Sequence, residues 1–285
     1  MAKKSVRVVI DPTQPLTASG LTSVKLFIAV PTYMGVVHSG CMLSLFKLTH
    51  ELRNKGIQQH LRMLDGEMVA RARNRLVADF LESDCTHMLF LDSDITFNPE
   101  SLLRMLWANL GVVGGVYPKK QMRWQGAFNH ARTAGSTPET TAEAALSYVV
   151  NALPNGKGKM VRDCFSVSYV GTGFLLIQRP VIEAMVKQYR KLRYTDDCPD
   201  AAPRTIPALF DYKIVGDRYL SEDYYFCDLW RRMGGTVWAA ANCPLAHAGS
   251  HVFTGDFGKR LRPSNGAPIN PSRRIGREPN SQREI

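Results

Sequence analysis

Residues 86–94 read THMLFLDSD, an apolar run that ends directly in two aspartates. The run predicts a β-strand, and residues two apart in an extended chain point to the same side. Asp92 and Asp94 can therefore both face one object at the carboxyl end of this strand, which is the end where ligands of open α/β sheets bind.

Two carboxylates at a strand end have two interpretations. They suit a hard divalent cation that bridges to a diphosphate, because such a cation takes oxygen ligands and is usually held by a few carboxylates plus substrate phosphates. They also suit a solvated turn, since Asp and Ser are ordinary turn residues.

Outward from this stretch, Val, Ile and Leu runs alternate with helical periodicity over the first 120 residues. This alternation predicts βα units around a mainly parallel sheet flanked by helices. Strands are expected at 24–30, 86–91, 111–117 and 236–240, and helices at 40–54, 67–82, 180–189 and 221–233. The patterning weakens over 119–159, which predicts a long loop or a poorly ordered insertion. Residues 256–285 lack apolar periodicity, and we expect an irregular basic tail there.

The charge of the 285-residue chain is its unusual property: 36 Lys and Arg against 25 Asp and Glu leave a net charge of +11. Such an excess indicates a polyanionic partner or an anionic substrate. The apolar run before Asp11 is too short for a secretory signal. The sequence contains no stretch of about 18 apolar residues, so no membrane span is predicted. Six cysteines without a CxxC pair predict reduced thiols, not a zinc site, in a cytoplasmic protein. Dinucleotide, P-loop, GxSxG and HExxH motifs are absent from the sequence.

Six segments occur in this order: LFIAVPTY, ARARNRLVADFLESDCTHMLFLDSDITFNPESL, GVVGGVYPKK, GTGFLLIQR, SEDYYFCDLWRRMGG and PLAHAG. The ordered set spans roughly residues 24–255 and resembles the nucleotide-sugar glycosyltransferases of the GT-A fold, of the soluble bacterial or phage type with a DxD motif. The resemblance implies an α/β, GT-A-like single domain over 1–255 with a Rossmann-like central sheet, followed by the tail at 256–285.

The resemblance also implies a donor site. The loop after the first strand would place Pro31, Thr32 and Tyr33 against the base and ribose, although Tyr33 could equally pack within the loop. Asp92 and Ser93 would lie near the ribose and the metal.

A metal site follows from the same resemblance. Asp92 and Asp94 match the DxD, with Asp94 as the more direct ligand, and a late histidine completes the coordination. His247 fits this role and His251 competes with it. Imidazole suits Mn²⁺ better than Mg²⁺, so the expected cofactor is Mn²⁺, or Mg²⁺.

Three further positions have both functional and structural interpretations. Arg73 would contact the nucleotide or lie on a solvated basic helix face. Gly171-Thr172-Gly173 would let the backbone approach the donor closely, or would mark a bulge or bend. Lys119, with Lys120, would contact donor phosphates or an acidic acceptor, or would be a solvated pair.

Asp223 and Glu222 are the candidate catalytic residues. An inverting transfer needs a base that removes the acceptor hydroxyl proton, a role we assign to Asp223, with Glu222 binding sugar hydroxyls. Both also stabilise a helix start, and the helix dipole there lowers a carboxylate pKa unless the site is dry. In a retaining enzyme Asp223 would position substrates instead.

The predicted function is metal-dependent transfer of a hexosyl or pentosyl group from a nucleotide sugar, with a UDP-sugar favoured, to a hydroxyl. Three acceptors are considered: hydroxymethylated bases of phage DNA, a cell-surface glycan or lipopolysaccharide, and a protein. A phage-encoded enzyme would act in the host cytoplasm. A nucleotidyltransferase and a non-catalytic nucleic-acid-binding protein are the alternatives to a glycosyltransferase.

A second concentration of charge bears on the partner. Basic and aromatic residues interleave between 119 and 132 without an acidic residue: Lys119, Lys120, Arg123, Trp124, Phe128, His130 and Arg132. This pattern suits phosphate contact with base stacking, a lid over a sugar diphosphate, or a solvated loop.

Overall fold

The computed structural model describes residues 14–154, 156, 158–196, 203–249 and 252–255. The predicted tail at 256–285 lies outside the described residues. Two other residues named above or counted among the cysteines, His251 and Cys198, also lie outside them. The other five cysteines are buried and form no disulfide within the described residues. No helix within the described ranges is long and apolar enough to cross a bilayer.

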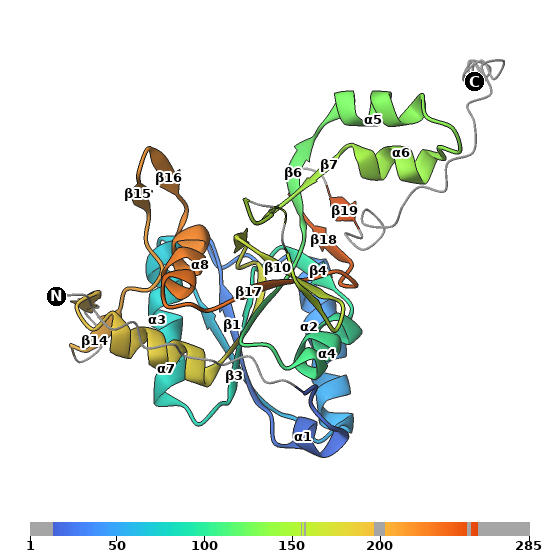
Figure 1. Cartoon of the computed structure of the whole chain (residues 1–285). Coiled ribbons are helices and arrows are strands. Elements are labelled where there is room, and N and C mark those ends of the chain that lie inside the picture. Colours follow the sequence, from blue (N-terminus) through green and yellow to red (C-terminus); the bar gives the residue numbers. More distant parts are fainter. Residues whose placement is uncertain (1–13, 155, 157, 197–202, 250–251, 256–285) are drawn as a thin grey trace, which may run out of the picture.

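A central sheet of eight strands organises the described part of the chain (Figure 1). In spatial order these are β2 (Gln58–Leu64), β1 (Lys25–Pro31), β3 (His87–Leu91), β12 (Phe174–Gln178), β5 (Val112–Gly115), β17 (Val237–Ala240), β10 (Cys164–Val167) and β9 (Met160–Val161). The pairings make β2, β1, β3, β5, β17 and β9 run in one direction and β12 and β10 in the other. The predicted α/β class with a mainly parallel sheet flanked by helices is confirmed.

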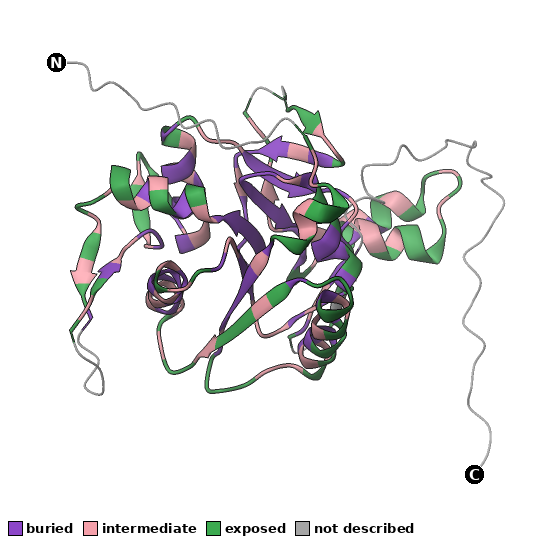
Figure 2. Ribbon diagram, turned by 90° about the horizontal axis from the view of Figure 1, so that it is seen from below, coloured by how far each residue is buried: buried purple, intermediate pink, exposed green. Residues whose placement is uncertain are grey.

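Helices cover both faces of this sheet. One face carries α3 (Val69–Glu82), α7 (Arg179–Gln188) and α8 (Glu222–Arg232); the other carries α2 (Ser39–Asn54) and α4 (Pro99–Ala108), with α1 (Ala18–Thr22) beside them. Alternate residues of β1 supply the two cores, Phe27 to the first and Ile28 to the second, as the pleat of a strand dictates. Figure 2 shows the buried residues gathered on the central strands and on the inner faces of these helices.

Local sequence signals explain several helix ends. Asn98 caps α4 by accepting the Glu100 N–H at 3.0 Å, and Pro99 occupies the first helical position. At the start of α8, Ser221 occupies the N-cap position, but its hydroxyl donates to the Asp223 carboxylate and accepts no backbone N–H.

Short sheets lie outside the central sheet. They include β4 (Ile95–Phe97) with β18 (Leu245–His247) and β19 (Phe253–Gly255), β8 (Val150–Asn151) with β11 (Tyr169–Val170), β13 (Arg193–Thr195) with β14 (Thr205–Pro207), and β15 (Lys213–Val215) with β16 (Arg218–Leu220). The register of β18 with β4 sets His247 opposite Ile95, next to Asp94.

The prediction of a long loop over 119–159 is wrong for most of that segment. Residues 118–148 form an arm that consists of β6 (Pro118–Met122), α5 (Trp124–Ala131), α6 (Pro138–Ala144) and β7 (Leu146–Tyr148), and it projects from the sheet (Figure 1). A capping box between Thr137 and Thr140 starts α6. The helices gave a weak pattern because α5 buries only Ala127 and α6 buries no residue.

Candidate functional site

The two aspartates stand where β3 ends and the chain turns into β4. The Asp92 N–H donates to the Gly173 carbonyl at 2.9 Å, and the Ile95 N–H donates to the Asp92 carbonyl at 3.1 Å, which fixes the turn. The side chains are partly exposed, Asp92 by 26% and Asp94 by 32%, so each can meet a ligand.

Asp94 faces a lysine from the arm and a histidine from β18. Its Oδ2 accepts from Lys120 Nζ at 2.5 Å, and its Oδ1 lies 3.5 Å from His247 Nε2. Burial would raise the pKa of Asp94, but His247 and Lys120 outweigh it and hold that pKa below its ordinary value. The carboxylate is therefore ionised at neutral pH.

His247 is oriented by the backbone. Its Nδ1 lies 2.9 Å from the Pro118 carbonyl oxygen, which can only accept, so Nδ1 carries the hydrogen. The other ring nitrogen, Nε2, faces Asp94. Metal-bound imidazoles are commonly held in this way, with the second ring N–H on a carbonyl or carboxylate.

Asp94 and His247 offer two ligand atoms to a divalent cation. Among the described residues, no group of three or more His, Cys, Asp or Glu side chains is arranged to hold a metal ion. The pair of Asp94 Oδ1 and His247 Nε2 fits two positions of such a site, because ligands at about 2.0–2.6 Å from one cation lie roughly 3–3.5 Å apart. Asp94 Oδ1 is also buried without a hydrogen-bond partner, and a cation would satisfy it.

Asp92 is engaged differently, by Arg73. The Arg73 side chain is only 3% exposed; its Nη2 donates to Asp92 Oδ1 at 2.9 Å and its Nε to Glu222 Oε1 at 3.3 Å. Burial opposes the charge, but Asp92 and Glu222 hold the pKa of Arg73 above its ordinary value. The interpretation of Arg73 as part of a solvated helix face is wrong, because it joins α3, β3 and α8 behind the aspartates.

A cavity of about 230 Å³ opens beside this turn. It is lined by Pro31, Thr32, Tyr33, Glu67, Val69, Asp92, Ser93 and Asp94. The structure thus brings together six of the predicted donor and metal residues from two strand ends. Larger cavities of about 380 and 700 Å³ lie elsewhere, and neither is lined by Asp92, Asp94 or His247.

The loop after β1 is fixed against the end of β2. The Thr32 N–H donates to the Leu64 carbonyl at 2.8 Å, and the Gly35 N–H donates to Asp65 Oδ1 at 2.6 Å. Gly35 has a φ of +65°, a conformation that glycine adopts without a steric penalty. Tyr33, at 79% exposure, is consequently presented at the mouth of the cavity and not packed within the loop.

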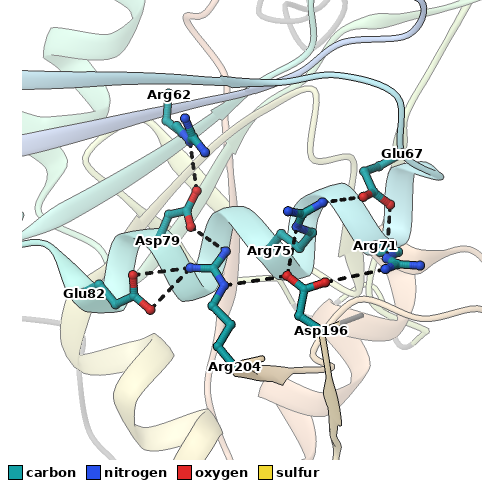
Figure 3. A network of polar contacts seen from close by, with 8 residues as sticks. All are labelled: Arg62, Glu67, Arg71, Arg75, Asp79, Glu82, Asp196 and Arg204. Atoms are coloured by element: carbon teal, nitrogen blue, oxygen red, sulfur yellow. Dashed lines mark hydrogen bonds and ion pairs between the residues drawn. The ribbon is translucent and has the colours of Figure 1, made fainter. Parts of the chain in front are cut away.

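Glu67 lines the cavity from the start of α3, and the sequence analysis missed it as a site residue. Its Oε2 pairs with Arg71 Nε at 3.1 Å and its Oε1 with Arg75 Nη1. Figure 3 shows how Asp196, whose side chain is 2% exposed, accepts from these arginines and from Arg204. The network continues along α3 through Arg62, Asp79 and Glu82 (Figure 3). The Glu67–Arg71 pair is local, four positions apart, but Asp196 and Arg204 lie more than 100 positions from α3, so no local pattern signalled their part in the network.

Gly171, Thr172 and Gly173 lie beneath Tyr117, all three buried, and do not line the cavity. A Cβ at Gly171 would stand 2.2 Å from Tyr117 Oη, and one at Gly173 would stand 2.8 Å from Tyr117 Cζ. The Tyr117 hydroxyl accepts the Gly173 N–H at 3.1 Å. The glycines therefore make room for a tyrosine that supports Asp92, and the sequence analysis did not single out that tyrosine.

Asp223 and Glu222 begin α8 on the other side of Arg73. Burial, and then the neighbouring charge of Glu222, raise the pKa of Asp223 to about 6, against the lowering by Ser221 and Arg73. This is the dry-site case that was set apart from the effect of the helix dipole, because desolvation is the largest influence on this pKa. Glu222 is 8% exposed and pairs with Arg73.

The remaining candidate, Lys119, is exposed on β6 next to Lys120 and makes no ion pair with the described residues.

Comparisons with known proteins leave the family open. No family model and no curated protein matches the chain. Among solved structures, the STIV protein A197 is 18% identical over 88% of this chain and 100% of its own, with a TM-score of 0.42. A Drosophila beta-1,4-galactosyltransferase 7 in complex with manganese, UDP-Gal and xylobiose is 14% identical over 86% and 76%, with a TM-score of 0.40. A glycosyltransferase involved in glycosylation of the PBCV-1 major capsid is 11% identical over 62% and 69%, with a TM-score of 0.30. The chemistry of the site therefore rests on its own residues.

Proposed function

We propose that this chain is a metal-dependent glycosyltransferase of the GT-A type that moves a sugar from a nucleotide sugar, a UDP-sugar by preference, to a hydroxyl acceptor. One observation carries the proposal: Asp94 Oδ1 and His247 Nε2 lie 3.5 Å apart at the edge of the cavity that Asp92 and Tyr33 also line.

The cavity would hold the nucleoside of the donor. Its volume of about 230 Å³ is below the 300–1,000 Å³ of pockets that enclose a whole small molecule, so it suits one part of the donor. The exposed ring of Tyr33 is available for stacking, and the carboxylate of Glu67, held by Arg71 and Arg75, can accept an N–H from the base.

The diphosphate would lie beside the aspartates. Asp94 and His247 would hold Mn²⁺, or Mg²⁺, with the donor phosphates as further ligands, and that cation would neutralise the charge of the leaving nucleoside diphosphate. Lys120, which pairs with Asp94, is a cation of the arm beside this region, and Lys119 is exposed on the same strand.

Asp223 would remove the proton from the attacking hydroxyl in an inverting transfer. A pKa of about 6 leaves it ionised at neutral pH and makes it a stronger base than an ordinary aspartate. Glu222 would act mainly through Arg73, which ties it to Asp92, and could accept from a sugar hydroxyl with its other oxygen.

Calorimetry and thermal shifts test this function. UDP with Mn²⁺ should raise the melting temperature more than UDP alone, GDP with Mn²⁺ should raise it less, and Asp94→Asn should abolish the metal-dependent part. Asp84→Asn is the matched control, because Asp84 is exposed and pairs with Lys25 far from the cavity. The absence of any metal-dependent shift with every nucleoside diphosphate would reject the proposed function.

A further inference from the structure

The arm at 118–148 exposes two large aromatic side chains on α5. Trp124 is 70% exposed and Phe128 is 56% exposed, four positions further along the helix. Residues four apart lie on the same helix face, so the two rings form one aromatic strip. The Arg132 guanidinium lies 5.5 Å from the centre of the Phe128 ring and continues the strip.

This strip faces away from the other helix of the arm. At Gly126 the two helices touch so closely that a Cβ would stand 2.4 Å from the Ala144 carbonyl oxygen. Residues two apart on a helix are about 200° apart around its axis. Trp124 and Phe128, each two positions from Gly126, therefore lie on the side of α5 opposite α6.

Positive charge accompanies the strip. Lys119, Lys120, Arg123 and Arg132 are exposed, and no acidic residue occurs between 118 and 138. The two acidic residues of the arm, Glu139 and Glu143, both lie on α6. The α5 side of the arm thus combines stacking surface with cations.

We propose that the aromatic strip of α5, with Lys119 and Arg123, binds single-stranded nucleic acid, whose bases stack on Trp124 and Phe128 and whose phosphates contact the cations. Aromatic side chains beside a basic groove are the means by which proteins hold single strands without reading their sequence. A neutral glycan would use the rings but would gain nothing from the charge, and a duplex hides the faces of its bases.

The strip is connected to the candidate site by β6. Lys120 of that strand pairs with Asp94, and His247 bonds to the carbonyl of Pro118, its first residue. β6 thus connects the strip to the end of β3, where a base with a hydroxyl substituent in the bound nucleic acid would be the acceptor. This role as acceptor rests on the proposed function; the binding itself does not.

Fluorescence anisotropy with a labelled oligothymidylate of about 15 nucleotides tests the surface. Trp124→Ala and Phe128→Ala should each weaken binding about fivefold or more, because stacking of a base on an aromatic side chain has an effect of this size. Lys119→Ala should reduce the slope of log K against log salt by about 0.7.

The matched controls are Trp107→Ala on α4 and Phe46→Ala on α2, which remove aromatic residues that are 46% and 67% exposed elsewhere. Neither should change the affinity, and all variants keep the basic residues 256–285. Thermal shifts with UDP and Mn²⁺ should be unchanged in Trp124→Ala and Phe128→Ala, which separates this surface from the donor site.

Each outcome is decisive for the surface. Failure to bind the oligonucleotide, equal affinity of the α5 variants and the wild type, equal weakening in the controls, or tighter binding of a duplex would overturn it. If the wild-type protein binds the oligonucleotide as expected but its melting temperature does not respond to UDP with Mn²⁺, the proposed function is rejected and the nucleic-acid surface is retained.

Discussion

The raised pKa of Asp223 predicts how the rate of sugar transfer depends on pH. With a pKa of about 6, the base is about one-tenth ionised at pH 5, whereas an aspartate with an ordinary pKa near 3.9 would remain more than nine-tenths ionised. We expect kcat/KM to fall about tenfold between neutral pH and pH 5. The assay is release of the nucleoside diphosphate from the nucleotide sugar at low donor concentration, between pH 4.5 and 8.

Two neighbouring variants should move this apparent pKa in opposite directions. Ser221→Ala removes a hydroxyl that donates to Asp223 and stabilises its ionised form, so the apparent pKa should rise. Glu222→Gln removes the neighbouring negative charge and frees Arg73, so the apparent pKa should fall. Both variants retain Asp223, and the position of the profile is independent of the maximal rate.

An apparent pKa near 4 in the wild type would refute the reasoning, as would a profile that neither variant shifts. Asp223→Asn should remove most of the activity; an unchanged rate in that variant would exclude Asp223 as the base.

Three further outcomes concern stability. Asp223→Asn should stabilise the fold at pH 7 by up to about 3 kcal/mol. The reason is that a carboxyl whose pKa is raised on folding gives stability that is complete below pH 4 and is lost as pH rises through about 6. Urea titrations at pH 4 and pH 7 would show the difference, and an equal effect of the substitution at both pH values would contradict it. Arg73→Met should cost about 3–5 kcal/mol in unfolding free energy by leaving two carboxylates unpaired, and a loss under 1 kcal/mol would contradict the buried pairing. Gly173→Ala should cost about 1–3 kcal/mol, since the added Cβ would overlap the Tyr117 ring, and unchanged thermal unfolding would show that the ring can move aside.

Local patterns were sufficient for the elements that position the aspartates. The apolar run that ends at Asp92 predicted β3, and the start of α4 follows from equally local signals, the cap Asn98 and Pro99 at the first helical position. These features depend on the period of apolar residues and on caps, which act over a few neighbouring positions.

Non-local contacts decided what the sequence could not predict. Arg73 lies on a helix with many cations, and only the folded chain sets it between Asp92 and Glu222, 19 and 149 positions away. The arm was predicted as a loop because its helices bury a single alanine and so lack the apolar stripe that identifies a helix. The pKa of Asp223 depends on burial, which the first turn of a helix does not reveal.

The most direct test of the account is the position of manganese. Crystals grown with UDP and Mn²⁺ should give an anomalous peak at the manganese edge within about 2.0–2.6 Å of both Asp94 Oδ1 and His247 Nε2, which are 3.5 Å apart. With bound UDP and no peak at this pair, or with a peak at another set of ligands, the assignment of Asp94 and His247 as metal ligands would be wrong.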